Sequence, residues 1–171
     1  MATLMRAATY AAVFIGFVLV FLPARVLEWA GARPPASIGP AQAVGIGVVL
    51  VGGTIALWCV LAFAVIGRGT PAPFDPPRRL VVRGPYRRVR NPMYLGAGLA
   101  LAGAAVYYGS IALFAFTGLF LLVAHLFVRG YEEPTLRKRF GADYEAYFGR
   151  VHRWLPRWDR GGGPAEGGTG A

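Results

Sequence analysis

The sequence predicts an all-α integral membrane protein with four transmembrane helices and a C-terminal helix lying at the cytoplasmic interface. Of its 171 residues, 56% are hydrophobic and 15% are charged, whereas about 25% of the residues of a soluble domain are charged. Three long stretches contain no Lys, Arg, Asp or Glu: residues 7–24, 34–67 and 91–128. Because a helix crosses the hydrocarbon core in about 20 apolar residues, these stretches are the natural membrane spans.

The third of these stretches is too long for one helix. Near its middle, the residues Tyr107-Tyr108-Gly109-Ser110 indicate a tight turn between two antiparallel helices. The four predicted spans lie at about residues 8–24, 41–66, 93–107 and 110–128. With their polar connections they make residues 1–160 a single membrane domain, followed by a flexible glycine-rich tail at residues 161–171.

The basic residues predict the orientation of this bundle. With four spans, 16 of the 18 Lys and Arg fall on one side of the membrane, and Arg25 and Arg33 fall on the other. The positive-inside rule then places both termini in the cytoplasm, together with the polar segments 68–92 and 129–160. The net charge of +10 is therefore explained by topology in a bacterial-type inner membrane, with the lipid bilayer as partner and no nucleic acid.

The first span has an alternative interpretation as a cleaved signal peptide. Arg6 precedes an apolar run, and Ala30-Gly31-Ala32 has the small residues of a cleavage site. About ten residues, including Pro23 and Glu28, separate the apolar run from that site. Since cleavage sites normally follow the apolar run closely, a retained helix is favoured.

The first long polar segment contains several backbone signals. Residues 70–77 are too rich in proline for a helix and predict a stiff extended connector. Residues 80–82 are predicted to be extended, and Gly84-Pro85 indicates a turn. Asn91 and Pro92 are then predicted to be the N-cap and the first residue of the third span.

The second polar segment predicts an amphipathic helix. Its apolar residues recur at three- and four-residue spacing: Leu136, Phe140, Tyr144, Phe148 and Val151. A single helix at the membrane surface accounts for this pattern, with its apolar side on the bundle or in the headgroup layer. Trp154 and Trp158 suit an interfacial anchor.

Two adjacent carboxylates, Glu132 and Glu133, come just before that helix. At a membrane boundary they repel each other and are costly to desolvate, so they need compensating partners. One interpretation is that both are solvated in the first turn of the helix. The other is a pocket in which one of them is the counter-charge of a bound cation. No metal site is predicted, because His125, His152 and Cys59 make a poor ligand set.

Three segments together resemble the isoprenylcysteine carboxyl methyltransferase family and are similar to its relatives among the phospholipid methyltransferases. They are residues 83–96 (RGPYRRVRNPMYLG), 132–147 (EEPTLRKRFGADYEAY) and 153–156 (RWLP), with a helical hairpin after the first. The resemblance covers residues 78–156, about half of the chain. It implies an integral-membrane enzyme that binds S-adenosylmethionine in a pocket at the cytoplasmic face.

The resemblance also implies which residues form the site. Cofactor contacts are expected from Arg78, Arg79, Leu80, Val81, Gly84, Tyr86, Asn91, Pro92, Met93, Tyr94, Gly96, Gly98 and Glu132. Arg129 lies one residue from the place of the family's substrate-binding arginine. Asn91 stands where the family usually has histidine, and because asparagine does not titrate near neutral pH, proton transfer at this position is in doubt.

The chemistry assigns a role to several of these residues. Glu132 suits the cofactor ammonium, and the faces of Tyr86 and Tyr94 suit its sulfonium. An acceptor carboxylate needs an arginine, for which Arg129 is the candidate, whereas an acceptor amine needs a base, for which Glu133 is the candidate. These two are the predicted catalytic residues.

Each of these assignments has a structural alternative. The two tyrosines also suit an interfacial belt, and Gly96 and Gly98 also suit close helix packing, as does the glycine-rich run 45–53. The arginines of the loop before the third span suit lipid phosphates: Arg87, Arg88 and Arg90. Cys59 is expected to act as a small apolar residue, and His125 is left between a pocket and an interhelical role.

The sequence thus predicts a membrane methyltransferase for an amphiphilic acceptor that enters from the bilayer. Carboxyl O-methylation of a prenylated, isoprenylcysteine-type acceptor or a similar lipophilic small molecule is expected first. N-methylation of a phospholipid amine is the alternative enzyme reading. A non-catalytic scaffold that binds anionic lipid through its arginines is the alternative of another class.

Overall fold

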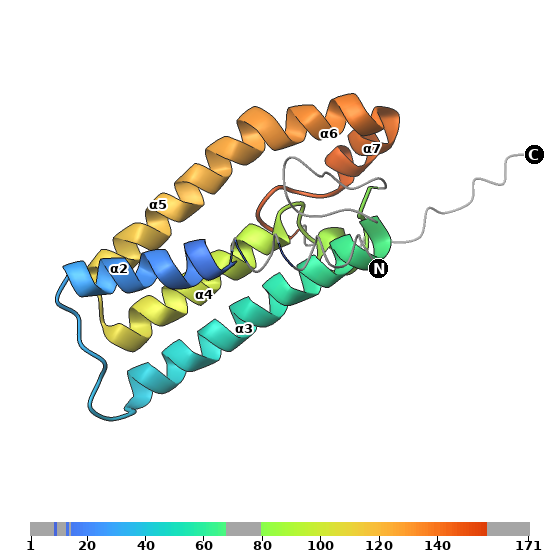
Figure 1. Cartoon of the computed structure of the whole chain (residues 1–171). Helices are drawn as coiled ribbons and strands as arrows, with labels where there is room; N and C mark the ends of the chain where they lie inside the picture. Colours follow the sequence, from blue (N-terminus) through green and yellow to red (C-terminus); the bar gives the residue numbers. More distant parts are fainter. Residues whose placement is uncertain (1–8, 10–12, 14, 68–79, 157–171) are drawn as a thin grey trace, which may run out of the picture.

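The computed structural model of the chain describes residues 15–67 and 80–156, together with Thr9 and Val13. Several predictions fall outside these residues: Arg6, the connector 70–77, Arg78, Arg79, Trp158 and the tail 161–171. The described part is helical, as expected. Its elements in order are η1 (Ile15–Phe21), α2 (Leu22–Trp29), α3 (Pro40–Ala62), η2 (Phe63–Gly67), η3 (Gly84–Arg87), α4 (Pro92–Tyr108), α5 (Ile111–Phe127), η4 (Val128–Glu132), α6 (Glu133–Phe140) and α7 (Ala142–Arg150) (Figure 1).

The predicted helical hairpin is confirmed. Helix α4 ends at Tyr108, and Gly109 follows it in the left-handed conformation with φ of 60°. Glycine adopts this conformation without a Cβ penalty and is common just after a helix. The Ser110 hydroxyl then accepts a hydrogen bond from the Leu113 N–H at 3.3 Å and caps α5. The chain therefore reverses within the four residues that the sequence singled out.

Helices α3 and α4 form the most extensive contact between elements, and glycine makes it possible. A Cβ added at Gly52 would lie 2.5 Å from both the Gly96 carbonyl oxygen and the Ala100 nitrogen. A Cβ at Gly103 would lie 2.7 Å from the Gly45 carbonyl oxygen. The two backbones are therefore in direct contact, which confirms the packing interpretation of the glycine run for Gly45 and Gly52. We call this contact the glycine seam.

Two helices of the described part are long and apolar enough to cross a membrane: α3, and the continuous helix Ile111–Phe140 formed by α5, η4 and α6. Large apolar side chains are exposed along both, among them Leu50, Leu57, Leu61, Leu119, Leu122 and Leu126. Helix α4 has 17 residues. The first predicted span corresponds to η1 and α2, which reach Trp29 rather than residue 24. Four spans stay a prediction.

The single amphipathic helix predicted after Pro134 is wrong. Helix α5 instead continues through η4 into α6, and Gly141, with φ of 51°, ends α6 before α7 turns back (Figure 1). The apolar spacing continued across this break because α6 and α7 both contribute to one cluster. Its buried residues are Tyr144, Tyr147 and Val151, and Leu80, Leu136, Phe140 and Phe148 pack against them.

Candidate functional site

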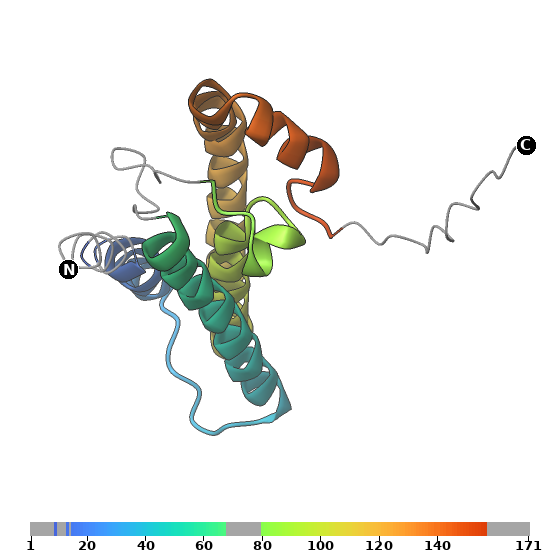
Figure 2. The same cartoon turned by 90° about the vertical axis from the view of Figure 1, so that its right-hand side faces the viewer.

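The described parts of the two polar segments, residues 80–92 and 129–156, lie side by side (Figure 2). Val89 and His152 form a parallel backbone bridge, and the Arg90 N–H donates to the His152 carbonyl at 2.9 Å. The Tyr147 hydroxyl donates to the Tyr86 carbonyl at 2.7 Å. The loop before α4 is therefore held against the chain that follows α6.

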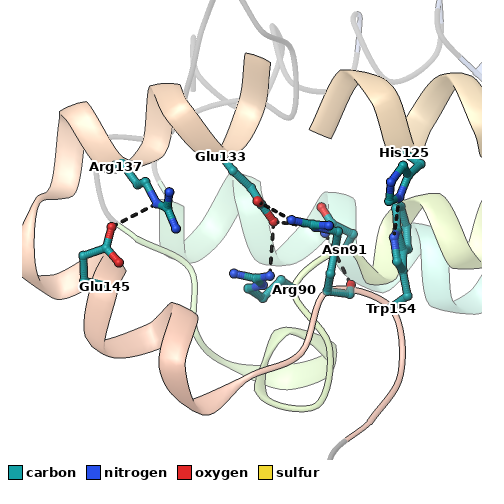
Figure 3. Close-up of polar contacts among 8 residues, drawn as sticks. Arg90, Asn91, His125, Glu133, Arg137, Glu145 and Trp154 are labelled. Atoms are coloured by element: carbon teal, nitrogen blue, oxygen red, sulfur yellow. Dashed lines mark hydrogen bonds and ion pairs between the residues drawn. The ribbon is translucent and has the colours of Figure 1, made fainter. Parts of the chain in front are cut away.

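Glu133 lies at the centre of the contact between these segments. It accepts hydrogen bonds from Arg153, from Nε to Oε1 at 2.8 Å and from Nη2 to Oε2 at 2.7 Å, and Arg90 Nη2 lies 3.2 Å from Oε1 (Figure 3). The residue is 6% exposed. Burial alone would raise the pKa of Glu133, but the Arg153 hydrogen bonds and the Arg90 charge outweigh it and lower the pKa. Glu133 is thus held as a carboxylate whose two oxygens are both committed.

The side chain of Arg90 is 7% exposed, so its predicted contact with lipid phosphate is wrong. Its guanidinium carbon lies 3.8 Å from the centre of the Phe148 ring, a cation–π geometry. Its Nε and Nη1 are buried and have no hydrogen-bond partner within the described ranges. The packing of the described residues therefore encloses two unpaired donors of this guanidinium. Arg87 and Arg88 are exposed, and their lipid contact stays a prediction.

Glu132 has surroundings opposite to those of its neighbour. Its Oε2 accepts a hydrogen bond from the Tyr94 hydroxyl at 3.2 Å. Among the residues that the structure describes, Tyr94 is its one hydrogen-bond partner and no cation pairs with it. Burial raises the pKa of Glu132 to about 7; the Tyr94 hydrogen bond opposes this rise, and the charge of Glu133 adds to it. Glu132 is therefore an uncompensated, partly buried acid.

Tyr86 lies near this acid, and two of the predicted cofactor residues, Val81 and Met93, pack beside it. Burial raises the pKa of Tyr86, and the Glu132 charge contributes to the rise. Tyr86 is 6% exposed, so the interfacial-belt alternative is wrong for it. It clusters with Cys59, whose predicted apolar role the packing confirms, and the other members are Ala62, Val81, Ile55, Phe63, Ile66 and Met93. Leu80 packs instead in the Tyr144 cluster, and Gly84, with φ of 62°, lies against Trp58.

Asn91 and Pro92 begin α4 as predicted, but the side chain of Asn91 does not cap the helix. Its Nδ2 instead donates to the Arg153 carbonyl oxygen at 3.3 Å (Figure 3). A cap would use the side-chain oxygen as an acceptor for a helix N–H, whereas here the side-chain amide donates to the C-terminal segment and no N–H of α4 donates to the oxygen. The predicted capping role is therefore wrong, although the helix boundary is right.

Gly96 and Gly98 face neighbouring helices. A Cβ at Gly96 would lie 2.8 Å from the Gly52 carbonyl oxygen of α3, and one at Gly98 would lie 2.7 Å from Leu121 Cδ2 of α5. These positions favour the packing alternative over a direct contact with a cofactor.

The two other candidates lie on the long helix. Arg129 is exposed on η4 and makes no hydrogen bond or ion pair within the described residues. His125 Nδ1 accepts a hydrogen bond from Trp154 Nε1 at 3.0 Å (Figure 3). His125, which the sequence left unassigned, therefore joins α5 to the C-terminal segment, and Trp154 is partly buried against it.

Sequence reasoning did not identify Arg90 and Arg153 as the partners of Glu133. The available signal was the pair of adjacent carboxylates, which demands compensating charge. It did not say which of the 18 basic residues supplies that charge, because pairing is decided by three-dimensional proximity. The structure brings together Tyr86, Tyr94 and Glu132 among the predicted cofactor residues.

These features describe a helical membrane protein with a partly buried acidic site at one end of its bundle. Residues 40–143, more than half of the chain and including Tyr94 and Glu132, match the family model of phospholipid methyltransferase. The chain belongs to this family and is a membrane methyltransferase. Comparison with curated proteins and with solved structures gives no match.

Proposed function

We propose that this protein transfers a methyl group from S-adenosylmethionine to an amphiphilic acceptor at the cytoplasmic face of the membrane. The observation that carries the proposal is Glu132, a partly buried carboxylate that pairs with Tyr94 and with no cation of the described chain. An isolated acid in such surroundings is costly unless a cation binds to it. Membership of the methyltransferase family supports the same conclusion.

The residues present fit the charges of this cofactor. S-adenosylmethionine supplies an electrophilic methyl group on a sulfonium, and it also carries an ammonium and a carboxylate. Glu132 provides the negative charge for the cationic groups, and the ring of Tyr94 provides an aromatic face beside it. The cofactor carboxylate suits an arginine side chain. From the family resemblance, the wall of the pocket is proposed to be Leu80, Val81 and Gly84 of the loop and Met93 of α4.

Carboxyl O-methylation of an isoprenylcysteine-type acceptor remains the first candidate reaction. A carboxylate is already anionic and needs no base, and the exposed guanidinium of Arg129 is free to bind it. Positioning the acceptor in line with the methyl group can supply about 7–11 kcal/mol of such a reaction's barrier. Glu133 is not needed for this reaction, and its ion pairs already hold it.

N-methylation of a phospholipid amine is the second candidate, favoured by the description of the matching family. An amine must lose a proton before it attacks, so this reaction needs a base. Because Glu133 is committed to two arginines, the base in this case is Glu132, which then takes the proton of the amine instead of pairing with the cofactor ammonium; its raised pKa of about 7 without a bound cation suits the role.

We also propose that four helices span the membrane, with both termini on the cytoplasmic side. The α4–α5 hairpin, the exposed apolar faces of α3 and α5, and the distribution of arginines support this topology. In this arrangement the polar cluster around Glu133 lies at the inner leaflet. The acceptor then approaches Glu132 from the bilayer while the cofactor enters from water.

Calorimetric titration of the detergent-purified protein with S-adenosylmethionine tests the proposal. We expect Glu132→Gln to weaken binding about tenfold to a hundredfold, because it removes the charge that compensates a cation. Glu145→Gln is the matched control, since Glu145 is exposed on α7. Affinity of the unsubstituted protein should rise about fivefold to tenfold from pH 6 to pH 7.5, as Glu132 ionises, and Glu132→Gln should flatten this dependence.

The outcomes separate the candidates. Absence of binding by the folded protein would refute the enzyme and favour a lipid-binding scaffold. Methyl incorporation is then measured with a prenylated cysteine that has a free carboxylate and with an amine phospholipid. Incorporation into the amine lipid alone would overturn the first candidate reaction in favour of the second.

A further inference from the structure

Four consecutive residues after α7, which we call the strap (residues 151–154), each contact a different part of the molecule. Val151 is buried with Tyr144 and Tyr147. The backbone of His152 pairs with Val89 and Arg90. Arg153 contacts two residues: its side chain donates to Glu133, and its carbonyl accepts from Asn91. Trp154 donates to His125. The strap thus joins the loop before α4 to the long helix of α5 and α6.

The two attachments of Arg153 flank the hydrogen bond of the proposed site. Its carbonyl accepts from Asn91, which lies just before the first turn of α4, and Tyr94 lies in that turn. Its guanidinium binds Glu133, the residue next to Glu132. Tyr94 and Glu132 are therefore each anchored by a neighbour in the chain that Arg153 holds.

The glycine contact between α4 and α5 lies at a different level of the bundle. Gly98 of α4 contacts Leu121 of α5, which is more than two turns before Glu132 along the long helix. Beyond that contact, the Tyr94–Glu132 hydrogen bond links α4 directly to the long helix. The side-chain fork of Arg153 is fixed by two short hydrogen bonds to a buried carboxylate, a geometry that specifies position as well as charge.

We propose that Arg153 is a positioning residue that holds Tyr94 and Glu132 at the separation required for cofactor binding. The two adjacent acids then have separate tasks: Glu132 faces the cofactor, and Glu133 fastens the strap. This inference rests on the proposed function, in that it assigns a consequence for S-adenosylmethionine binding. It adds the part of the chain after residue 143, beyond the match to the family model.

The test compares Arg153→Met and Arg153→Lys with His152→Ala in full-length protein. His152 is the matched control because its side chain is exposed and its backbone makes the bridge. We expect Arg153→Met to raise the KM for S-adenosylmethionine about tenfold to a hundredfold, with kcat recovered at saturating cofactor. Arg153→Lys should recover part of the loss, since lysine supplies charge without the fork. The Arg90 amide should exchange with deuterium faster in Arg153→Met than in the control.

The two readouts distinguish this inference from the proposed function. If the unsubstituted protein binds no S-adenosylmethionine, the proposed function fails, and exchange at Arg90 alone decides whether Arg153 fastens the strap. If the unsubstituted protein is active and Arg153→Met keeps its KM and its exchange rate, the inference is overturned. A fall in kcat with an unchanged KM also overturns it, because Arg153 would then act in the chemical step. If Arg153→Met does not fold, the KM of Arg153→Lys decides.

Discussion

The glycine seam and the strap end of the molecule are held together by different means. In the seam, α3 and α4 bring their backbones into contact through glycines, and the interaction is one of shape. At the strap end, residues from the loop before α4, from α6 and from the C-terminal segment meet around Glu133 through charge and hydrogen bonds. Added volume should therefore destabilise the seam, whereas removal of charge should destabilise the strap end. Each region can be broken separately.

Removing the central charge of the strap end should have the largest effect on stability. Glu133→Ala leaves the Arg90 and Arg153 guanidinium groups without their carboxylate, and Arg90 is buried. We expect a loss of about 3–5 kcal/mol in the free energy of unfolding, measured by denaturant titration in detergent. Glu145→Ala removes the exposed partner of Arg137 and should cost at most about 1 kcal/mol. Equal losses in the two variants would contradict the distinction.

The pKa of Glu133 gives this contribution a pH dependence with a definite sign. Because the pKa is lower in the folded chain than in the unfolded chain, the folded state binds fewer protons. The stabilisation is therefore complete above the ordinary carboxyl pKa and is lost as the pH falls through the lowered value. When the denaturant titration is repeated at decreasing pH, Glu133→Ala should lose less stability than the unsubstituted protein.

Much of the fold was predictable because it depends on local signals. The charge-free stretches located α3 and the α4–α5 hairpin, and the turn followed from Gly109. Pro92 marked the first residue of α4. The C-terminal region was predicted wrongly because residues 136–151 keep helical apolar spacing across a break at Gly141. A spacing pattern reports that residues share one cluster, and it does not report that they share one helix.

The site was predictable only where a local sequence signal pointed to it. Adjacent carboxylates signalled a demand for compensating charge, and the resemblance indicated Tyr94 and Glu132, which the structure joins by a hydrogen bond. The sequence did not separate the tasks of Glu132 and Glu133, because that separation depends on which arginines lie close to which carboxylate. Arg153 is 20 residues from Glu133 in the sequence, and no local pattern links them.

Adding volume to the seam should have the next largest effect. Gly52→Ala places a Cβ 2.5 Å from backbone atoms of Gly96 and Ala100, which cannot move aside as a flexible side chain can. We expect a loss of about 1–3 kcal/mol in stability, measured by thermal unfolding in detergent. Gly53→Ala is the matched control, because its Cβ would meet no atom within 4 Å. A loss in Gly53→Ala as large as that in Gly52→Ala would show that the close backbone approach is not what the seam depends on.

The smallest expected effect lies at the far end of the strap and tests whether its attachments are equal. Trp154→Phe keeps an aromatic ring and removes the indole N–H that donates to His125 Nδ1 at 3.0 Å. Because this is a single side-chain hydrogen bond, we expect a loss of about 0.5–1.5 kcal/mol in stability, measured by thermal unfolding. Leu155→Ala, at an exposed position next to it, should cost less. If Trp154→Phe instead matched Glu133→Ala, the hold of the strap would come from its contact with α5 rather than from the buried carboxylate, and the charge-based account of this end of the molecule would be wrong.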